Sequence, residues 1–241
     1  MRIALLNPNT TEAMTDAMAT VARAVLPPDV GVAPFTAPRG PEAIEGYEEQ
    51  AVAAATVCEM MRLHPGFDAY LIACFGDPGL YPARELTRAP VVGIGQAAYH
   101  AACVLGRRFA VLTTLARGIG TIEDRLIAYG LLDRCAAIRP TGVPVLGHGS
   151  GGEGLSRLCH EACRAVEENG ADTIVLACGS MAGEAEAVAE AAAVPVVDGM
   201  VVGALQAYSL ARAGLWTSKR GAFALPEAVG YRNMPVAYHG T

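Results

Sequence analysis

Two of the seven cysteines in this chain of 241 residues occupy positions suited to acid and base chemistry. Cys74 ends the apolar run 68–74, and Cys178 ends the apolar run 173–178. Inverting a carbon centre by proton transfer needs a base on one face and an acid on the other. A thiolate and a thiol, whose ordinary pKa is about 8.5, provide that pair near neutral pH.

A glycine-containing turn toward a predicted helix follows each of these cysteines. Backbone N–H groups and the positive end of a helix are therefore expected to favour the thiolate form. Gly179 and Ser180 offer further N–H donors to an enolate oxygen that forms on the substrate. The alternative for either cysteine is a small buried hydrophobic residue, which is the common role of cytosolic cysteines.

The other five cysteines fall within apolar patterns and are interpreted as core residues: Cys58, Cys103, Cys135, Cys159 and Cys163. Cys159 and Cys163 lie four residues apart on a predicted helix, with His160 between them. A zinc site would need a second ligand pair at suitable spacing, and none stands nearby in the sequence. No metal is therefore expected.

The elements that must position the two chemical cysteines repeat along the chain. Short apolar runs alternate with helical patterns from end to end, which predicts parallel sheets with crossover helices. Three pairs of features recur at offsets of 106, 104 and 105 residues: the strands from Ile3 and Phe109, the two cysteines, and the runs 90–92 and 195–197. Such a period indicates two copies of one lobe, and the alternative is a chance alignment of short apolar runs.

The predicted fold class is α/β, with two pseudo-twofold-related Rossmann-like lobes of mostly parallel sheets. Ligands of open α/β sheets bind beyond the carboxyl ends of the strands, so both cysteines should face one active-site cleft between the lobes. Lobe 1 is expected to comprise residues 1–97 and 206–241, and lobe 2 residues 98–205.

The apolar and helical patterns also predict the boundaries of the elements. Strands are predicted at 3–6, 68–74, 90–94, 109–114, 135–139, 173–178 and 195–198, and helices at 48–63, 81–88, 121–129 and 155–169, with a last helix that ends near 214. Asn9 is expected to cap the first helix, with Glu12 completing a capping box, and Pro27 ends that helix. The glycine- and proline-rich segment 34–46 is predicted to be a long loop beside a pocket or on the surface.

Composition and charge exclude several classes of protein. Charged residues make up 17% of the chain, against roughly 25% in an average globular protein, and 52% of the residues are hydrophobic, so the chain is expected to fold. A net charge of −6 with no basic run argues against a nucleic-acid partner. There is no run of about 18 apolar residues, so no membrane span is expected. Met1 leads directly into a strand without a signal peptide, which indicates a cytoplasmic, reduced protein.

Three motif-like stretches lack the residues that their usual chemistry requires. Residues 93–98 imitate a dinucleotide fingerprint, but the next strand ends at Thr113 and Thr114 where a ribose-binding acid is needed, so NAD is not expected. The glycine-rich loop 147–154 lacks the lysine of a phosphate loop. Cys178 stands where a nucleophile elbow around Ser180 would need a glycine.

With these residues noted, the chain resembles the hydantoin and allantoin racemases, within the aspartate/glutamate racemase superfamily, over essentially its whole length. The resemblance rests on short motifs that are weak singly and specific together: Asn7-Pro8-Asn9-Thr10, Ile44-Glu45-Gly46, Cys74-Phe75-Gly76-Asp77-Pro78-Gly79-Leu80, Arg84-Glu85-Leu86, Pro90-Val91-Val92-Gly93-Ile94, Arg108-Phe109, Thr113-Thr114-Leu115, Cys178-Gly179, Pro195-Val196-Val197-Asp198-Gly199 and Thr217-Ser218-Lys219-Arg220-Gly221.

That resemblance implies a two-lobed α/β fold, a small-molecule substrate with a hydantoin or ureide ring, no cofactor, and assembly as a homo-oligomer. It also implies that two cysteines, which match Cys74 and Cys178, carry out racemisation. The residues expected to bind the ring are Asn9, Ala43, Ile44, Thr113, Thr114, Gly179 and Ser180.

Two of those positions depart from the family pattern. Ala43 stands where a serine is usual, and Ser180 stands where alanine or glycine is usual. Both departures concern recognition of the ring rather than proton transfer. Phe75 and Gly76 replace the polar Asn-Thr pair that follows the first cysteine in the amino-acid racemases of the superfamily, and this replacement suits a neutral ring.

The resulting hypothesis is a cofactor-independent racemase of 5-substituted hydantoins or allantoin, with proton transfer at the ring C5. One alternative is a related activity on the same scaffold: an amino-acid racemase, an arylmalonate-type decarboxylase or a maleate-type isomerase. Another is a non-catalytic small-molecule binding protein, in which the cysteines would need no lowered pKa.

Overall fold

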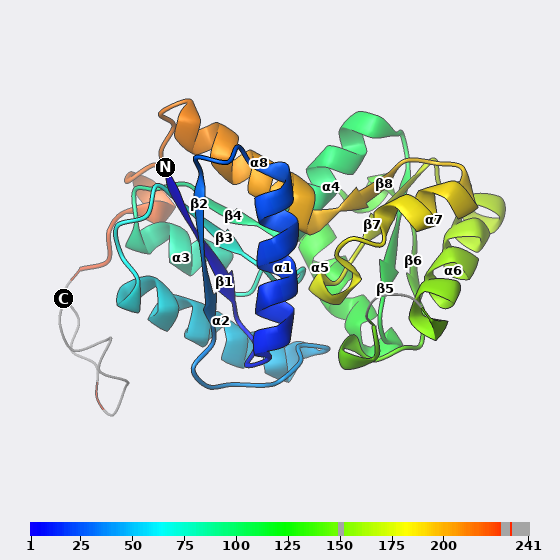
Figure 1. Cartoon of the computed structure of the whole chain (residues 1–241), viewed down its shortest axis with the longest axis horizontal. Coiled ribbons are helices and arrows are strands. Elements are labelled where there is room, and N and C mark those ends of the chain that lie inside the picture. Colours follow the sequence, from blue (N-terminus) through cyan, green and yellow to red (C-terminus); the bar gives the residue numbers. More distant parts are fainter. Residues whose placement is uncertain (149–151, 228–231, 233–241) are drawn as a thin grey trace.

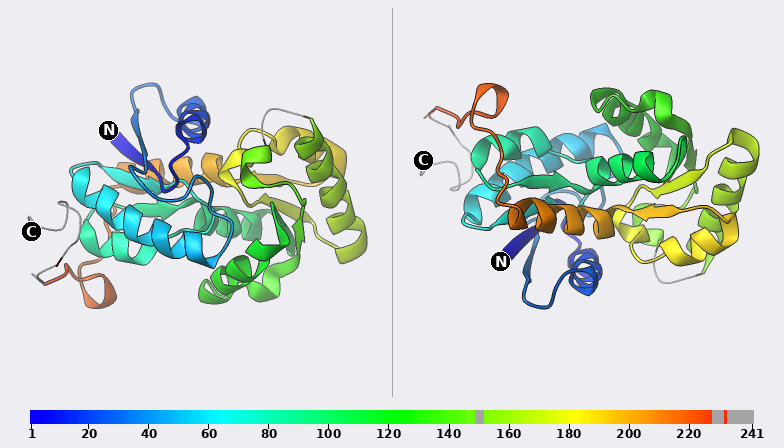
Figure 2. Two further views of the ribbon diagram at one scale, coloured as in Figure 1. Left: turned by 90° about the horizontal axis from the view of Figure 1, so that it is seen from below. Right: turned by 90° about the horizontal axis from the view of Figure 1, so that it is seen from above.

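The computed structural model of the chain describes residues 1–148, 152–227 and 232 (Figure 1). Two four-stranded parallel sheets lie side by side, each with helices on both faces (Figures 1 and 2). The first sheet has the order β2-β1-β3-β4, with β1 (Arg2–Asn7), β2 (Gly31–Thr36), β3 (Ala69–Ile72) and β4 (Val91–Gly93). The second has the order β6-β5-β7-β8, with β5 (Phe109–Thr113), β6 (Cys135–Pro140), β7 (Thr173–Leu176) and β8 (Val196–Asp198). The corresponding strands take the same places, so the predicted two-lobed α/β fold is confirmed.

Both faces of each sheet are buried because apolar residues occupy successive strand positions. Ile3 and Leu5 of β1 belong to one core cluster, and Ala4 and Leu6 belong to another on the opposite face. The helices that cover the sheets are α1 (Glu12–Val25), α2 (Tyr47–Leu63), α3 (Leu80–Leu86), α4 (Ile94–Leu105), α5 (Ile119–Ala128), α6 (Glu153–Asn169), α7 (Ala185–Ala192) and α8 (Gly199–Arg212).

The last helix of each half packs on the lobe of the other half. Beyond its first turn, α4 buries Ala98, Tyr99 and Ala102 against the second sheet together with α5. In return, α8 buries Ala204 and Ala207 against β3, β4 and α1 of the first lobe. Figure 2 shows α8 (orange) running from the second lobe across the first. The chain therefore crosses between lobes at the starts of these two helices.

The structure differs from the predicted elements at four places. Residues 31–36 form the edge strand β2 rather than the start of a loop, and Pro34 is tolerated there because an edge strand has a side without ladder hydrogen bonds. Helices α4 and α7 were not predicted. The residue that precedes α1 is Thr11, since the side chain of Asn9 accepts the Thr11 N–H at 3.0 Å in a local turn and the helix starts later.

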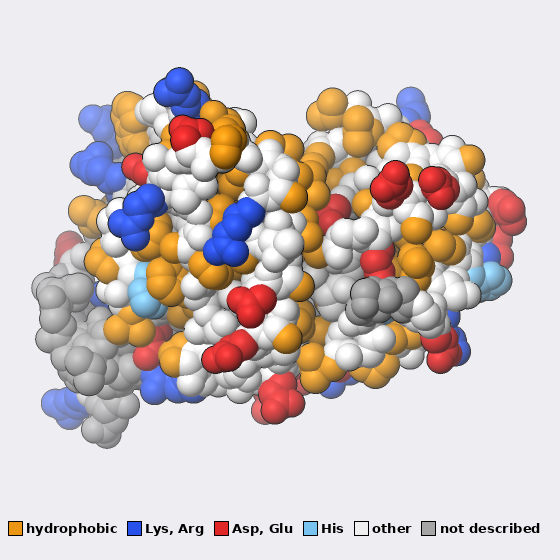
Figure 3. Space-filling view, in the orientation of Figure 1, with side chains coloured by type: hydrophobic (Ala, Val, Ile, Leu, Met, Phe, Trp, Pro, Cys, Tyr) orange, Lys and Arg blue, Asp and Glu red, His pale blue; other side chains and the backbone are white. Residues whose placement is uncertain are grey.

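Residues 149–151 of the glycine-rich loop, and residues 228–231 and 233–241 of the C-terminal segment assigned to lobe 1, lie outside the described residues. Among those described, no helix combines the length and apolar character needed to cross a membrane. On the face drawn in Figure 3, basic side chains lie mainly over the first lobe and acidic side chains over both.

Candidate active site

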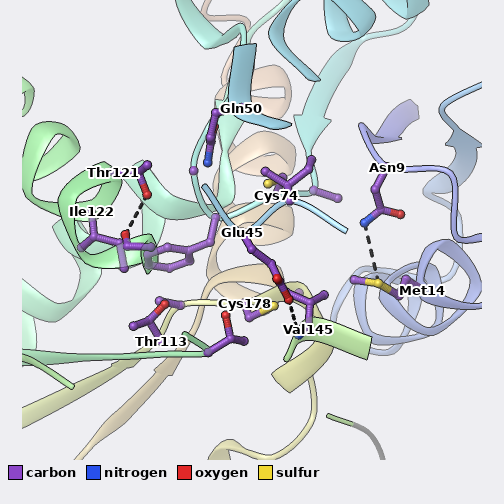
Figure 4. Close-up of a pocket in the computed structure, with 18 residues that line it drawn as sticks. Asn9, Met14, Glu45, Gln50, Cys74, Thr113, Thr121, Ile122, Val145 and Cys178 are labelled. Atoms are coloured by element: carbon purple, nitrogen blue, oxygen red, sulfur yellow. Dashed lines mark hydrogen bonds between the residues drawn. The ribbon is translucent and has the colours of Figure 1, made fainter. Parts of the chain in front are cut away.

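The two cysteines singled out from the sequence line one pocket between the lobes. Cys74 lies two residues after β3, and Cys178 lies two residues after β7, so each follows a central strand of its own sheet. The pocket holds about 600 Å³ of space not filled by atoms, part of it open to solvent. Figure 4 shows the two thiols entering from opposite sides of the pocket.

Five of the seven predicted ring-binding residues line this pocket with the cysteines: Asn9, Ile44, Thr113, Thr114 and Gly179. Ala43 and Ser180 are not among the residues that line it in the described part of the chain. Ser180 instead contacts the thiol directly, with its Oγ 3.0 Å from the Sγ of Cys178. Asn9 holds its Nδ2 3.7 Å from the Sδ of Met14, which is a weak acceptor.

Several lining residues were not predicted. From the first lobe they are Met14, Glu45, Gln50, Ala73, Phe75 and Gly76, and from the second Gly118, Thr121, Ile122, Val145 and Ala177. Glu45 follows the predicted Ile44, and Gln50 lies in the first turn of the helix after it. The position of these two polar residues next to a predicted pocket loop was the signal that could have identified them. Val145 has no such local signal, because only the tertiary fold brings it to the first lobe.

Polar contacts hold residues 45–49, which include the start of α2, against the second lobe. The Val145 N–H donates to the Glu45 carboxylate at 2.9 Å. The Tyr47 hydroxyl donates to Asp124 of α5 at 2.9 Å, and Arg117 pairs with Glu49 at 2.9 Å. These contacts place Glu45 and Gln50, from the first lobe, on the wall of a pocket that the second lobe completes.

A buried carboxylate fixes the loop after Cys74. The Asp77 N–H donates to the Cys74 carbonyl at 3.0 Å. The Asp77 Oδ1 accepts the Gly95 N–H at 3.0 Å. The Asp77 Oδ2 accepts the Gln96 N–H at 2.6 Å and the Tyr129 hydroxyl at 2.7 Å. Asp77 thus joins the loop that carries Cys74 to the N-terminus of α4 and to the second lobe.

The close approach of Asp77 explains Gly93, the residue that precedes α4. A Cβ at Gly93 would lie 2.1 Å from the Asp77 Oδ1, closer than real atoms come. Burial outweighs the three hydrogen bonds and raises the pKa of Asp77 to about 6. The carboxyl group is therefore largely ionised at neutral pH and able to accept all three bonds.

Burial is also the main influence on the pKa values of the two thiols. It raises the pKa of Cys74 to about 12, and the N–H of Gly76 only partly opposes this effect. The pKa of Cys178 is raised for the same reason, against hydrogen bonds from Ser180 that lower it. The expectation that the turns favour thiolates is wrong in its net direction, although the backbone N–H groups act as expected.

The two thiols line one pocket, where a charge on Cys178 acts on Cys74. A charge on Cys178 further raises the pKa of Cys74. Two thiolates together are therefore disfavoured, and the accessible ionised state of the pair is one thiolate and one thiol.

Comparisons with known proteins all match most of the chain. Residues 3–207 match the sequence profile of the Asp/Glu/hydantoin racemase family. A hydantoin racemase from Pseudomonas sp. (strain NS671) is 38% identical over 234 residues, which cover 96% of this chain and 94% of that protein. The structure of an allantoin racemase from Klebsiella pneumoniae is 37% identical, covers 100% of both chains and superposes with a TM-score of 0.95. An allantoin racemase from Pseudomonas fluorescens, also 37% identical, covers 97% of this chain and 100% of its own with a TM-score of 0.91.

Proposed function

Because the chain belongs to the Asp/Glu/hydantoin racemase family, we propose that it racemises 5-substituted hydantoins, allantoin among them, without a cofactor. One observation supports this proposal above others: thiols from the two lobes line a single pocket from opposite sides. A carbon held between them has a proton donor or acceptor on each face.

In the proposed reaction, the thiolate of one cysteine removes the C5 proton of the ring. The electron pair of the broken C–H bond moves into an enolate whose negative charge lies on the adjacent carbonyl oxygen. The thiol of the other cysteine then protonates C5 from the opposite face and becomes the thiolate. The product is the other enantiomer, and the charge of the pair is unchanged, so the reverse reaction uses the same two groups in exchanged roles.

The pocket offers donors for the enolate oxygen. The Asn9 Nδ2 has only the Met14 sulfur as a partner in the described chain, and the hydroxyls of Thr113 and Thr114 make no hydrogen bond within it. Donors aimed at a developing oxyanion stabilise the transition state more than the ground state. An acidic C5 proton beside a carbonyl needs no more than such donors and a base of suitable strength.

A heavy-water experiment tests this function. One enantiomer of a 5-substituted hydantoin or of allantoin is incubated with the protein in D₂O, beside a sample without protein. We expect the optical rotation to fall to zero while one deuterium appears at C5 of the inverted product. Unchanged rotation with allantoin and with a panel of hydantoins would rule the function out.

The raised thiol pKa values predict how the rate depends on pH. Since both thiols are protonated at neutral pH, the fraction of protein with one thiolate grows about tenfold per pH unit below the lower pKa of the pair. We expect kcat/KM to rise with that slope from about pH 6 to about pH 9. The measurement is initial-rate polarimetry over this range with the protein-free rate subtracted. A flat profile would mean that the reactive thiolate forms at an ordinary or lowered pKa.

A further inference from the structure

The turns that carry the two pocket cysteines share one backbone geometry. In the first lobe the Asp77 N–H donates to the Cys74 carbonyl at 3.0 Å. In the second lobe the Met181 N–H donates to the Cys178 carbonyl at 3.1 Å. Each bond joins the cysteine to the residue three positions later, so the repeat of the two lobes extends to these turns.

The residue two positions after the cysteine differs between the turns. It is Gly76 in the first lobe and Ser180 in the second. In each turn its N–H donates to the thiol and lowers the pKa of that thiol. Only Ser180 adds a hydroxyl, whose Oγ lies 3.0 Å from the Sγ of Cys178. A Cβ at Gly76 would lie 1.6 Å from the Gln50 Nε2, so a serine in the first turn would need the Gln50 side chain to move away.

The direction of the contact between Ser180 and Cys178 depends on the charge of the sulfur. A thiolate has no proton to give, so the Ser180 hydroxyl is the donor whenever Cys178 is ionised. The Oγ of Ser180 has no other hydrogen-bond partner in the part of the chain that the structure describes. Hydrogen bonds to an ionised acceptor are roughly twice as strong as those between neutral groups. The contact therefore stabilises the thiolate more than the thiol.

Ser180 opposes the other influences on Cys178. Burial raises the pKa of this thiol, and the carboxylates of Glu45 and Glu184 raise it further. The turn packs on α1, which places the uncharged thioether of Met18 against it. The hydroxyl and the N–H of Ser180 are the hydrogen bonds that lower the pKa of Cys178.

Cys74 has no such hydroxyl. Burial raises its pKa to about 12, and charges on Cys178 and Asp77 act in the same direction. The N–H of Gly76 and the charge of Arg125 on α5 oppose these effects. Among the described residues, no side chain donates a hydrogen bond to the Cys74 sulfur. The two thiols of the pocket are therefore not equivalent.

We propose, in an inference that rests on the proposed function, that the Ser180 hydroxyl donates to the Cys178 thiolate, so that the single thiolate of the free pair forms on Cys178 rather than on Cys74. Ser180 is then a positioning residue that acts through the thiol, in place of the ring contact expected from the resemblance. The free protein holds its base on the second lobe and its acid on the first. It is ready for the enantiomer whose C5 proton faces Cys178, and the thiolate passes to Cys74 when that enantiomer is inverted.

Alkylation resolved by site tests this assignment without relying on turnover. The folded protein reacts with excess iodoacetamide at several values between about pH 7 and pH 9, where the thiolate is the reacting form. Mass spectrometry of digested samples gives the rate at each cysteine. Because the two pocket thiols share one opening to solvent, we expect Cys178 to react at least about threefold faster than Cys74 in the wild type.

Ser180→Ala is expected to slow the alkylation of Cys178 about threefold and to leave Cys74 within about twofold of its wild-type rate. Loss of a hydrogen bond to the thiolate should reduce the thiolate fraction about tenfold. The stronger nucleophile that remains recovers about threefold of that loss. Ser180→Gly, which copies Gly76 of the first turn, provides the same test should Ser180→Ala not fold.

Two further variants show whether the hydroxyl itself is responsible. Ser180→Thr keeps the hydroxyl on the same carbon and should retain the wild-type rate at Cys178. Ser209→Ala removes an exposed hydroxyl on α8, away from the pocket, and should leave both rates unchanged. Circular dichroism checks that each variant is folded.

Racemisation provides a second readout. Without the Ser180 hydroxyl, less Cys178 thiolate is present and the Cys178 thiol is a weaker acid. Ser180→Ala should therefore lower kcat/KM about threefold in the pH range where the rate rises. The factor should be the same for both enantiomers, because the equilibrium constant of a racemisation is one.

The outcomes separate this inference from the function on which it rests. Faster alkylation of Cys74 than of Cys178 in the wild type, or an unchanged Cys178 rate in Ser180→Ala, would overturn it. An equal slowing in Ser180→Thr would assign the effect to packing and would overturn it as well. If the alkylation rates behave as expected while neither allantoin nor any hydantoin is racemised, the thiolate assignment stands and the proposed function fails.

Discussion

Cys74→Ser and Cys178→Ser are each expected to lower the racemisation rate by about 1,000-fold or more, because positioned acid–base groups contribute roughly 10²–10⁴-fold. A serine hydroxyl is a much weaker acid than a thiol, so it supplies neither the proton nor the base. Neither side chain fills a tightly packed core position, since both are half-buried and face the pocket. The folded state should therefore persist. Polarimetry and circular dichroism on each variant check the two expectations.

Deuterium exchange catalysed by the same two variants tests the two-base mechanism. A variant with one remaining cysteine still has a base for one enantiomer, so deuterium from D₂O should enter that enantiomer only, without inversion. Cys74→Ser and Cys178→Ser should then select opposite enantiomers. Cys103→Ser is the control, because Cys103 lies on α4 away from the pocket and its loss should leave the rate unchanged. Near-wild-type racemisation by either pocket variant would contradict the mechanism.

Asp77→Ala is expected to lower the free energy of unfolding by about 3 kcal/mol or more, since each buried donor left without a partner costs about 1–3 kcal/mol. The change leaves the N–H groups of Gly95 and Gln96 and the Tyr129 hydroxyl unpaired. It also places alanine at a backbone φ of 47°, which asparagine and aspartate tolerate better than alanine. Denaturant titration gives the value.

Two other aspartate variants complete that measurement. Asp77→Asn keeps one side-chain acceptor and the size of the side chain, so its loss should be smaller than that of Asp77→Ala. Asp133→Ala removes an exposed carboxylate with no hydrogen bond in the described chain, and should change stability by no more than about 0.5 kcal/mol. Equal stability of Asp77→Ala and wild type would show that Asp77 does not hold the Cys74 loop.

The sequence predicts the layout of this molecule well where information is local or repeated. Buried parallel strands read as continuous apolar runs, and the recurrence near 105 residues places one cysteine after a central strand in each lobe. The strand β2 was not predicted from the sequence because it is a half-buried edge strand containing Pro34. It therefore has neither a continuous apolar run nor a clean alternation of apolar and polar residues.

The composition of the pocket wall could be predicted only in part. The end of β5 supplies Thr113, loops after strands supply Ile44 and Gly179, and the motifs point to these. Val145 reaches the pocket through a contact between the lobes, which no local pattern encodes. The direction of the thiol pKa shifts was wrong for the same reason, because desolvation depends on how closely the lobes meet and the turns alone suggest the opposite sign.

The crossing of α4 and α8 has a consequence for each half of the chain taken by itself. A segment ending near residue 105 would possess the first sheet and α4, but α4 would have no second sheet to cover, and the first sheet would lack α8. Two copies of such a segment could cover one another by exchanging their last helices. The single chain is thus organised like a helix-swapped dimer whose two subunits have been joined end to end.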